Sequence, residues 1–151
     1  MCRFLSFRLA ASCLGLLMAL PAPFAQSQGL PPHAWLFGTW TGGLFPPPER
    51  MTAQACFSQP VVIFTRDLVL RATVTQQEMA QRLVESARAT QGGMAFRFAA
   101  TAALPSMFGG SPAPVGFGCA TPNDLTVQRL SENEIAFPGC ADFSYPLVRC
   151  H

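Results

Sequence analysis

The chain has 151 residues, of which 50% are hydrophobic and only 12% are charged, with a formal charge of +2 at pH 7. All ten basic residues are arginine and none is lysine, and they do not form a cluster. The absence of a basic face argues against binding to nucleic acid. The absence of lysine excludes Schiff-base chemistry and a phosphate-binding loop of the usual lysine-containing kind.

The first 25 residues have the pattern of a cleavable secretory signal. Arg3 and Arg8 give this segment a basic start without an acid, and residues 9 to 20 form an uncharged apolar run. This run is shorter than the ~20 residues that span a bilayer, so we expect no stable membrane anchor. Two prolines follow, and the small residues Ala25 and Ser27 offer cleavage sites.

Two alternatives to a cleaved signal exist at this end of the chain. An uncleaved N-terminal anchor is disfavoured by the short apolar run and by the prolines after it. Residues 9 to 13 end in Cys13 and resemble a lipidation box, but Arg8 lies where the apolar core of a lipoprotein signal belongs. We therefore expect a periplasmic or secreted protein.

Removal of the signal leaves 126 residues that carry eight arginines and eight acids. This length corresponds to one domain with enough residues for a hydrophobic core. We assign residues 1–25 to the signal peptide, 26–33 to a short linker and 34–151 to a single β domain. The oligomeric state does not follow from the sequence.

Four cysteines remain after cleavage, namely Cys56, Cys119, Cys140 and Cys150. An even number of cysteines in an exported chain predicts disulfides, here two. Their wide spacing, without an internal histidine, argues against a zinc site. Three pairings are open, and we favour Cys119 with Cys140 and Cys56 with Cys150, because the first pair brackets a predicted hairpin.

Alternating apolar residues and β-branched runs predict strands along most of the domain. The predicted strands cover residues 35–41, 61–65, 68–75, 94–99, 125–130, 134–137 and 146–149. Residues 104–118, rich in glycine and proline, are expected to form a long loop. The fold class predicted is mainly β, a small antiparallel barrel or sandwich of six to eight strands.

The segment from 76 to 90 fits both a helix and a strand. Thr75 and Glu78 form a capping-box pattern, Glu78 and Arg82 are four residues apart, and Gly92 suits the position after a helix. Residues 82–85, followed by Gly92 and a strand, also suit one arm of a hairpin. Both interpretations remain open at this stage.

The sequence contains no clear pattern of catalytic residues. His33 precedes the first predicted strand and His151 is the last residue, so neither suits a nucleophile–histidine pair. Residues 109–113 resemble a nucleophile elbow but lack its final glycine. We expect no enzyme activity and assign no catalytic, metal or cofactor-binding residue, with a carboxylate-only enzyme as the least favoured alternative.

One short motif resembles that of a known family. Gly38-Thr39-Trp40, on the first predicted strand, resembles the Gly-x-Trp signature of lipocalins and related calycin barrels. Arg149, on the last predicted strand, is similar to the basic residue that packs over that tryptophan in the family. The acidic residue that commonly precedes the motif is replaced by apolar Phe37. The resemblance implies a small β-barrel, and small secreted bacterial barrels of this shape include metalloprotease inhibitors.

The function expected from these features is non-catalytic binding outside the cytoplasm. If the barrel is open at one end, the aromatic residues Trp35, Phe37, Phe96 and Phe98 are candidates to line a site for a small apolar ligand. The alternative is a protein-binding module or protease inhibitor that uses the proline-rich segment 46–48 or the loop 104–118. No cofactor is expected in either case.

Overall fold

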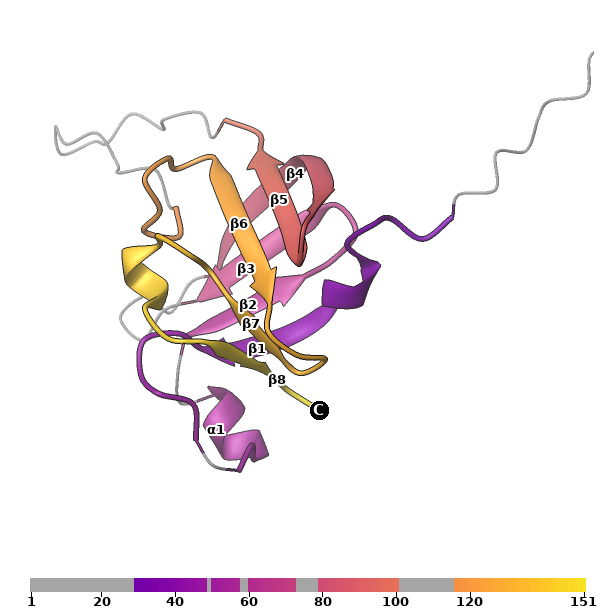
Figure 1. The fold of residues 1–151 in the computed structure, drawn as a ribbon. Coiled ribbons are helices and arrows are strands. Elements are labelled where there is room, and N and C mark those ends of the chain that lie inside the picture. The colour runs from indigo at the N-terminus through magenta and orange to yellow at the C-terminus, as the bar shows by residue number, and fades with distance from the viewer. Residues whose placement is uncertain (1–28, 49, 58–59, 73–78, 101–115) are drawn as a thin grey trace, which may run out of the picture.

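The structure is a computed structural model and describes residues 29–48, 50–57, 60–72, 79–100 and 116–151. Its described residues form a closed antiparallel barrel in which each strand pairs with its neighbour in sequence (Figure 1). The eight strands are β1 Gly38–Gly42, β2 Val61–Phe64, β3 Leu68–Ala72, β4 Ala80–Thr90, β5 Gly93–Phe98, β6 Asp124–Arg129, β7 Glu134–Ala136 and β8 Leu147–Arg149. The prediction of a mainly β fold is confirmed, with a barrel rather than a sandwich.

The barrel closes through the pairing of its first and last strands. Trp40 of β1 lies opposite Arg149 of β8, and Gly42 lies opposite Leu147. Closure satisfies the backbone groups that an open sheet leaves at its two edges. It also places the Gly-x-Trp motif and Arg149 side by side, although they are separated by more than one hundred residues.

The up-and-down order of the strands gives the barrel two different ends. At one end, the short 3-10 helix η1 (Ala34–Leu36) precedes β1, and short turns join β2 to β3, β4 to β5 and β6 to β7. We call this the η1 end. The opposite end, the loop end, carries longer connections: one includes helix α1 (Ala53–Phe57), and another includes the 3-10 helix η2 (Ala141–Phe143) (Figure 1).

The core lies inside the barrel and consists mostly of aromatic and branched side chains. Strand residues alternate between the interior and the outer face, as the period of two in the sequence predicted. The buried hydrophobic cluster comprises Leu36, Trp40, Val62, Phe64, Val69, Met94, Phe96, Phe98, Phe117, Leu125, Val127, Ile135, Phe137, Cys140, Phe143 and Leu147. The segments that contribute Phe117 and Phe143 lie outside the strands, so connections as well as strands build the core.

The helix considered for residues 76–90 is wrong for residues 80–90, which form strand β4, and 76–78 lie outside the described residues. β4 pairs with β3 on one side and β5 on the other. A bulge between Val84 and Ser86 shifts the register, so Val84 and Ala87 both pack against the core. Because of the bulge, the inward residues Val84 and Ala87 are three positions apart, which is also the spacing of residues on one face of a helix. Pairing with strands on both sides outweighs the local preference of this segment for a helix.

Two disulfides join the connections to the barrel. Cys119 pairs with Cys140, and Cys56 pairs with Cys150, as favoured from the sequence. The first bond ties the segment before β6 to the segment before η2, and the second ties α1 to the residue after β8. Disulfides of this kind are typical of exported proteins.

Three further expectations concern the start of the first strand, the signal peptide and the long loop. The strand predicted to begin at Trp35 begins at Gly38, because η1 occupies residues 34–36. The predicted signal peptide and residues 104–115 of the predicted long loop lie outside the described residues. Within the described part of the chain, no helix has the length and apolar character that a membrane crossing requires.

Candidate functional site

The two phenylalanines of β5 proposed as ligand-lining residues are packed inside the barrel. The Phe96 ring lies 5.6 Å from that of Phe64 and stacks on that of Phe98 at 6.1 Å, measured between ring centroids. Phe98 in turn stacks on Phe117 at 5.6 Å. A continuous set of aromatic contacts therefore runs from the middle of the barrel to its loop end.

The other two proposed lining residues lie at the η1 end. Trp35 is on η1, is partly buried and packs against the core. Phe37 follows η1 and meets the His33 ring edge-on at 5.3 Å, and the same histidine ring meets Phe96 edge-on at 5.3 Å. The structure thus brings Phe37 and Phe96 together through His33, while Phe98 lies further toward the loop end.

His33 is part of this packing, with only 3% of its surface exposed. Its Nε2 atom lies 3.1 Å from the backbone oxygen of Arg66, in the turn between β2 and β3. A buried histidine that bridges η1 to a turn explains why the segment before β1 is held against the barrel. Among the described residues, no group of three or more histidine, cysteine or acidic side chains has a metal-binding arrangement.

The loop end of the barrel is filled by side chains from the connections. The ring centroids of Phe117 and Phe143 lie 6.0 Å apart, and both rings contact Phe137, the residue after β7. The Arg71 guanidinium lies over Phe143 at 5.2 Å and donates to a carboxylate oxygen of Asp142 at 2.6 Å. These contacts fix η2 over the barrel opening.

A second arginine, Arg82 of β4, is almost completely buried at this end, with 1% of its surface exposed. It donates to the backbone oxygen of Pro122 at 2.9 Å and to the side-chain oxygen of Asn123 at 2.7 Å. Its guanidinium also lies 5.2 Å from the centre of the Phe98 ring. Desolvation lowers the pKa of Arg82 from its usual value, so the site must supply these acceptors to hold the charge.

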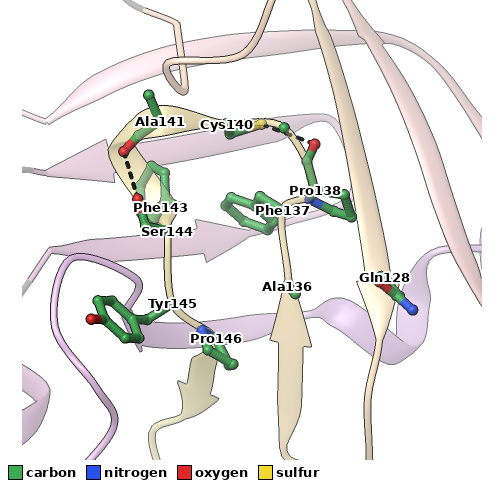
Figure 2. Close-up of a pocket in the computed structure, with 11 residues that line it drawn as sticks. Gln128, Ala136, Phe137, Pro138, Cys140, Ala141, Phe143, Ser144, Tyr145 and Pro146 are labelled. Carbon is green, nitrogen blue, oxygen red and sulfur yellow. Dashed lines mark hydrogen bonds between the residues drawn. The ribbon is translucent and has the colours of Figure 1, made fainter.

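A groove opens on the outer side of the β7–β8 connection, and we call it the loop-end groove (Figure 2). Its volume is about 580 Å³. None of the four aromatic residues proposed from the sequence lines it. Figure 2 shows Tyr145 and Pro146 on one side of Ala136 and Gln128 of β6 on the other. The full lining comprises Gln128, Ala136, Phe137, Pro138, Gly139, Cys140, Ala141, Phe143, Ser144, Tyr145 and Pro146.

Three large apolar or aromatic side chains are exposed on the connections beside this groove. Leu44, Phe45 and Tyr145 have 42%, 56% and 43% of their surface exposed. The amide of Tyr145 donates to the backbone oxygen of Gly43 at 2.8 Å, so the two connections run next to each other. We call these three residues the loop-end patch.

Neither the loop-end patch nor the groove was predicted from the sequence. The signal that was present is the pair Leu44-Phe45, two large apolar residues between a double glycine and three prolines. No strand includes them, so the alternation that identifies buried residues does not apply there. The contribution of Tyr145 depends on the pairing of two distant connections and has no local signature.

The η1 end contains the contacts that the Gly-x-Trp motif suggested. The Arg149 guanidinium lies 4.2 Å from the centre of the Trp40 ring, and the Trp40 indole donates to the backbone oxygen of Leu36 at 2.8 Å. Arg149 also donates to the backbone oxygens of Phe37 at 2.9 Å and Trp35 at 2.6 Å. One arginine therefore joins η1 to both β1 and β8, and these contacts stabilise the closed barrel.

No protein-family model matches the chain, and no curated protein or solved structure matches it either.

Proposed function

We propose that this protein is an exported, non-catalytic binding module that binds a partner protein through the loop-end patch and the adjoining groove. The main observation in favour of this proposal is that Leu44, Phe45 and Tyr145 are exposed on two adjacent connections. Exposed apolar and aromatic side chains that gather beside a groove are typical of protein-binding surfaces. Tyrosine and phenylalanine are also well suited to act as anchors because they bury a large area.

The packing beneath this surface supports the proposal. Phe117, Phe137 and Phe143 form the floor of the loop end, and the two disulfides restrain the connections above it. A surface that is rigid before binding loses less conformational entropy when a partner binds. Inhibition of an exported protease is one form that such binding takes, and it is consistent with the three prolines that follow Phe45.

The second candidate function is the binding of a small apolar ligand. The observation in its favour is the loop-end groove, because its volume of about 580 Å³ lies within the range of small-molecule sites. Phe137, Tyr145 and Pro146 give this groove apolar walls. This candidate places the ligand in the groove and not among Phe96 and Phe98 inside the barrel.

A lipocalin-like relationship is a further part of the proposal. It is supported by the closed eight-stranded barrel, by η1 before β1, and by the stacking of Arg149 on Trp40. Export is supported by the two disulfides and by the signal-like first 25 residues.

The test of the proposed function compares three forms of the mature protein as bait for the exported proteins of the source organism. The forms are wild type, the double variant Phe45→Ser/Tyr145→Ser, and Leu83→Ser. Leu83 is a matched control because it is 54% exposed on β4, away from the patch. The affinity of each captured protein, including any protease, is then measured with purified components.

We expect the double variant to bind the partner about tenfold more weakly or worse, and Leu83→Ser to bind it like wild type. Equal binding by all three forms contradicts the proposal. Native mass spectrometry of protein purified from the exporting cell tests the second candidate, because a bound apolar molecule adds mass that the unliganded chain lacks.

A further inference from the structure

The η1 end of the barrel holds two arginines, each of which lies over the ring of one of the two tryptophans. The Arg129 guanidinium lies 4.9 Å from the centre of the Trp35 ring, and that of Arg149 lies 4.2 Å from the centre of the Trp40 ring. Arg129 is on β6 and Arg149 is on β8, the strands on either side of β7. The register places both on the inward-facing side of their strands, at the end of the barrel next to η1.

Neither arginine forms an ion pair with a described side chain. The three ion pairs between described residues join Arg71 to Asp142 and Arg97 to Glu85 and Asp124. Backbone oxygens are the acceptors at the η1 end: Arg149 donates to those of Trp35 and Phe37, and the Nε atom of Arg129 donates to that of Ser131 at 3.3 Å. The positively charged guanidiniums of Arg129 and Arg149 therefore donate to uncharged backbone oxygens.

The two charges also act on each other. Desolvation lowers the pKa of Arg149, and the nearby positive charge of Arg129 lowers it further. Holding two like charges together is unfavourable, and an anion between them removes this cost. Both terminal nitrogens of Arg149 donate to backbone oxygens and each keeps one further N–H, whereas only Nε of Arg129 donates to one. The N–H groups that these bonds do not use, including those of both terminal nitrogens of Arg129, remain for a ligand.

We propose that Arg129 and Arg149 form a binding site for an oxyanion group, a carboxylate or a phosphate, at the η1 end of the barrel. The planar guanidinium presents paired donors whose spacing matches two oxygens of either group. Arg129 is exposed and Arg149 is partly exposed, so a ligand reaches them from solvent without opening the barrel. This site is at the opposite end of the barrel from the loop-end patch, so a negative result for one site does not contradict the proposal for the other.

The chain contains a built-in reporter for this site, because its only two tryptophans are Trp35 and Trp40. The experiment titrates the oxidised mature protein with inorganic phosphate and, separately, with acetate, while tryptophan fluorescence is recorded. Sodium chloride at equal ionic strength corrects for screening. The same titrations are made on Arg129→Gln and on the control Arg88→Gln, an exposed arginine of β4.

We expect a saturable fluorescence change with phosphate, acetate or both, and the ligand that saturates identifies which oxyanion the site prefers. Arg129→Gln should weaken this binding about tenfold or more, because it removes one charged donor pair, whereas Arg88→Gln should bind like wild type. The proposal is overturned if neither anion gives more change than chloride. It is also overturned if Arg129→Gln retains wild-type binding while its unfolding curve shows that it is folded.

Discussion

At the scale of single residues, Arg149 has the most consequential contacts at the η1 end. It stacks on Trp40 and donates two hydrogen bonds to backbone oxygens on either side of Leu36. Because Leu36 is fully buried, these bonds hold a core residue in place although η1 has only three residues. The same arginine joins the last strand to the first, so its effect on stability extends beyond its own contacts.

Replacement of Arg149 by alanine should therefore lower the free energy of unfolding by about 3 kcal/mol, because two charge-assisted hydrogen bonds and the stacking on Trp40 are lost. Urea unfolding followed by far-ultraviolet circular dichroism measures this change. Arg88→Ala is the matched control and should change stability by less than about 0.5 kcal/mol. Equal stability of the two variants would show that Arg149 does not hold the η1 end.

Gly43 and Gly92 provide a second matched pair at this scale. Both have positive φ angles, +85° and +82°, but a Cβ on Gly43 meets the Phe143 ring, whereas a Cβ on Gly92 meets nothing within 4 Å. We expect Gly92→Ala to cost about 1 kcal/mol from backbone strain alone. Gly43→Ala should cost about 3 kcal/mol because overpacking against Phe143 is added. Similar losses for both, measured by urea unfolding, would mean that Phe143 does not pack there.

At the scale of elements, β4 determines whether the barrel closes. It pairs with β3 through residues 80–83 and with β5 through residues 84–90, and the bulge lies between Val84 and Ser86, within the segment that pairs with β5. A helix in this position would leave the facing edges of β3 and β5 without partners. The bulge also makes a local bend in the strand and restores the inward orientation of Ala87.

The substitution Gln81→Thr tests whether this segment is a strand, because it should change the free energy of unfolding in opposite directions in a strand and in a helix. Gln81 is exposed on β4 opposite Leu70 of β3. In a strand, threonine should raise the free energy of unfolding by about 0.5 kcal/mol. In a helix, the same change would lower it by a similar amount. Chemical denaturation of the two proteins gives the sign, and a destabilised variant would contradict the assignment of β4.

The sequence was sufficient to predict most strands because their buried faces alternate. Residues 94–98 show this clearly: Met94, Phe96 and Phe98 are all buried, and β5 was predicted almost to its ends. The alternation fails where the register shifts, as at the bulge of β4. Phe117 could not be assigned to the core, because it lies in a connection and its burial depends on Phe98 and Phe143.

At the scale of the whole molecule, the two ends of the barrel have different chemistry. The loop end carries exposed Leu44, Phe45 and Tyr145 above a floor of phenylalanine rings. The η1 end carries Arg129 and Arg149 over the two tryptophans. The buried hydrophobic cluster lies between them, so the two binding sites that we propose are on opposite ends of the barrel.

The disulfides should contribute unequally to the stability of the whole domain. The bond between Cys56 and Cys150 spans 94 residues and that between Cys119 and Cys140 spans 21. Chain-entropy estimates give about 4.5 kcal/mol for the first and about 3 kcal/mol for the second. Pairwise replacement by serine, followed by urea unfolding, measures both values. A larger loss for the shorter loop would contradict an entropic origin of this difference.

The central claim is that the loop-end patch binds a partner protein, and site-specific photo-crosslinking in the exporting cell tests it most directly. A photoreactive residue replaces Phe45 in one form and Leu83 in a control form; these positions have nearly equal exposure, 56% and 54%. We predict a discrete crosslinked product of one partner from position 45 and none of that product from position 83. The same product from both positions, or no product from position 45, would contradict it.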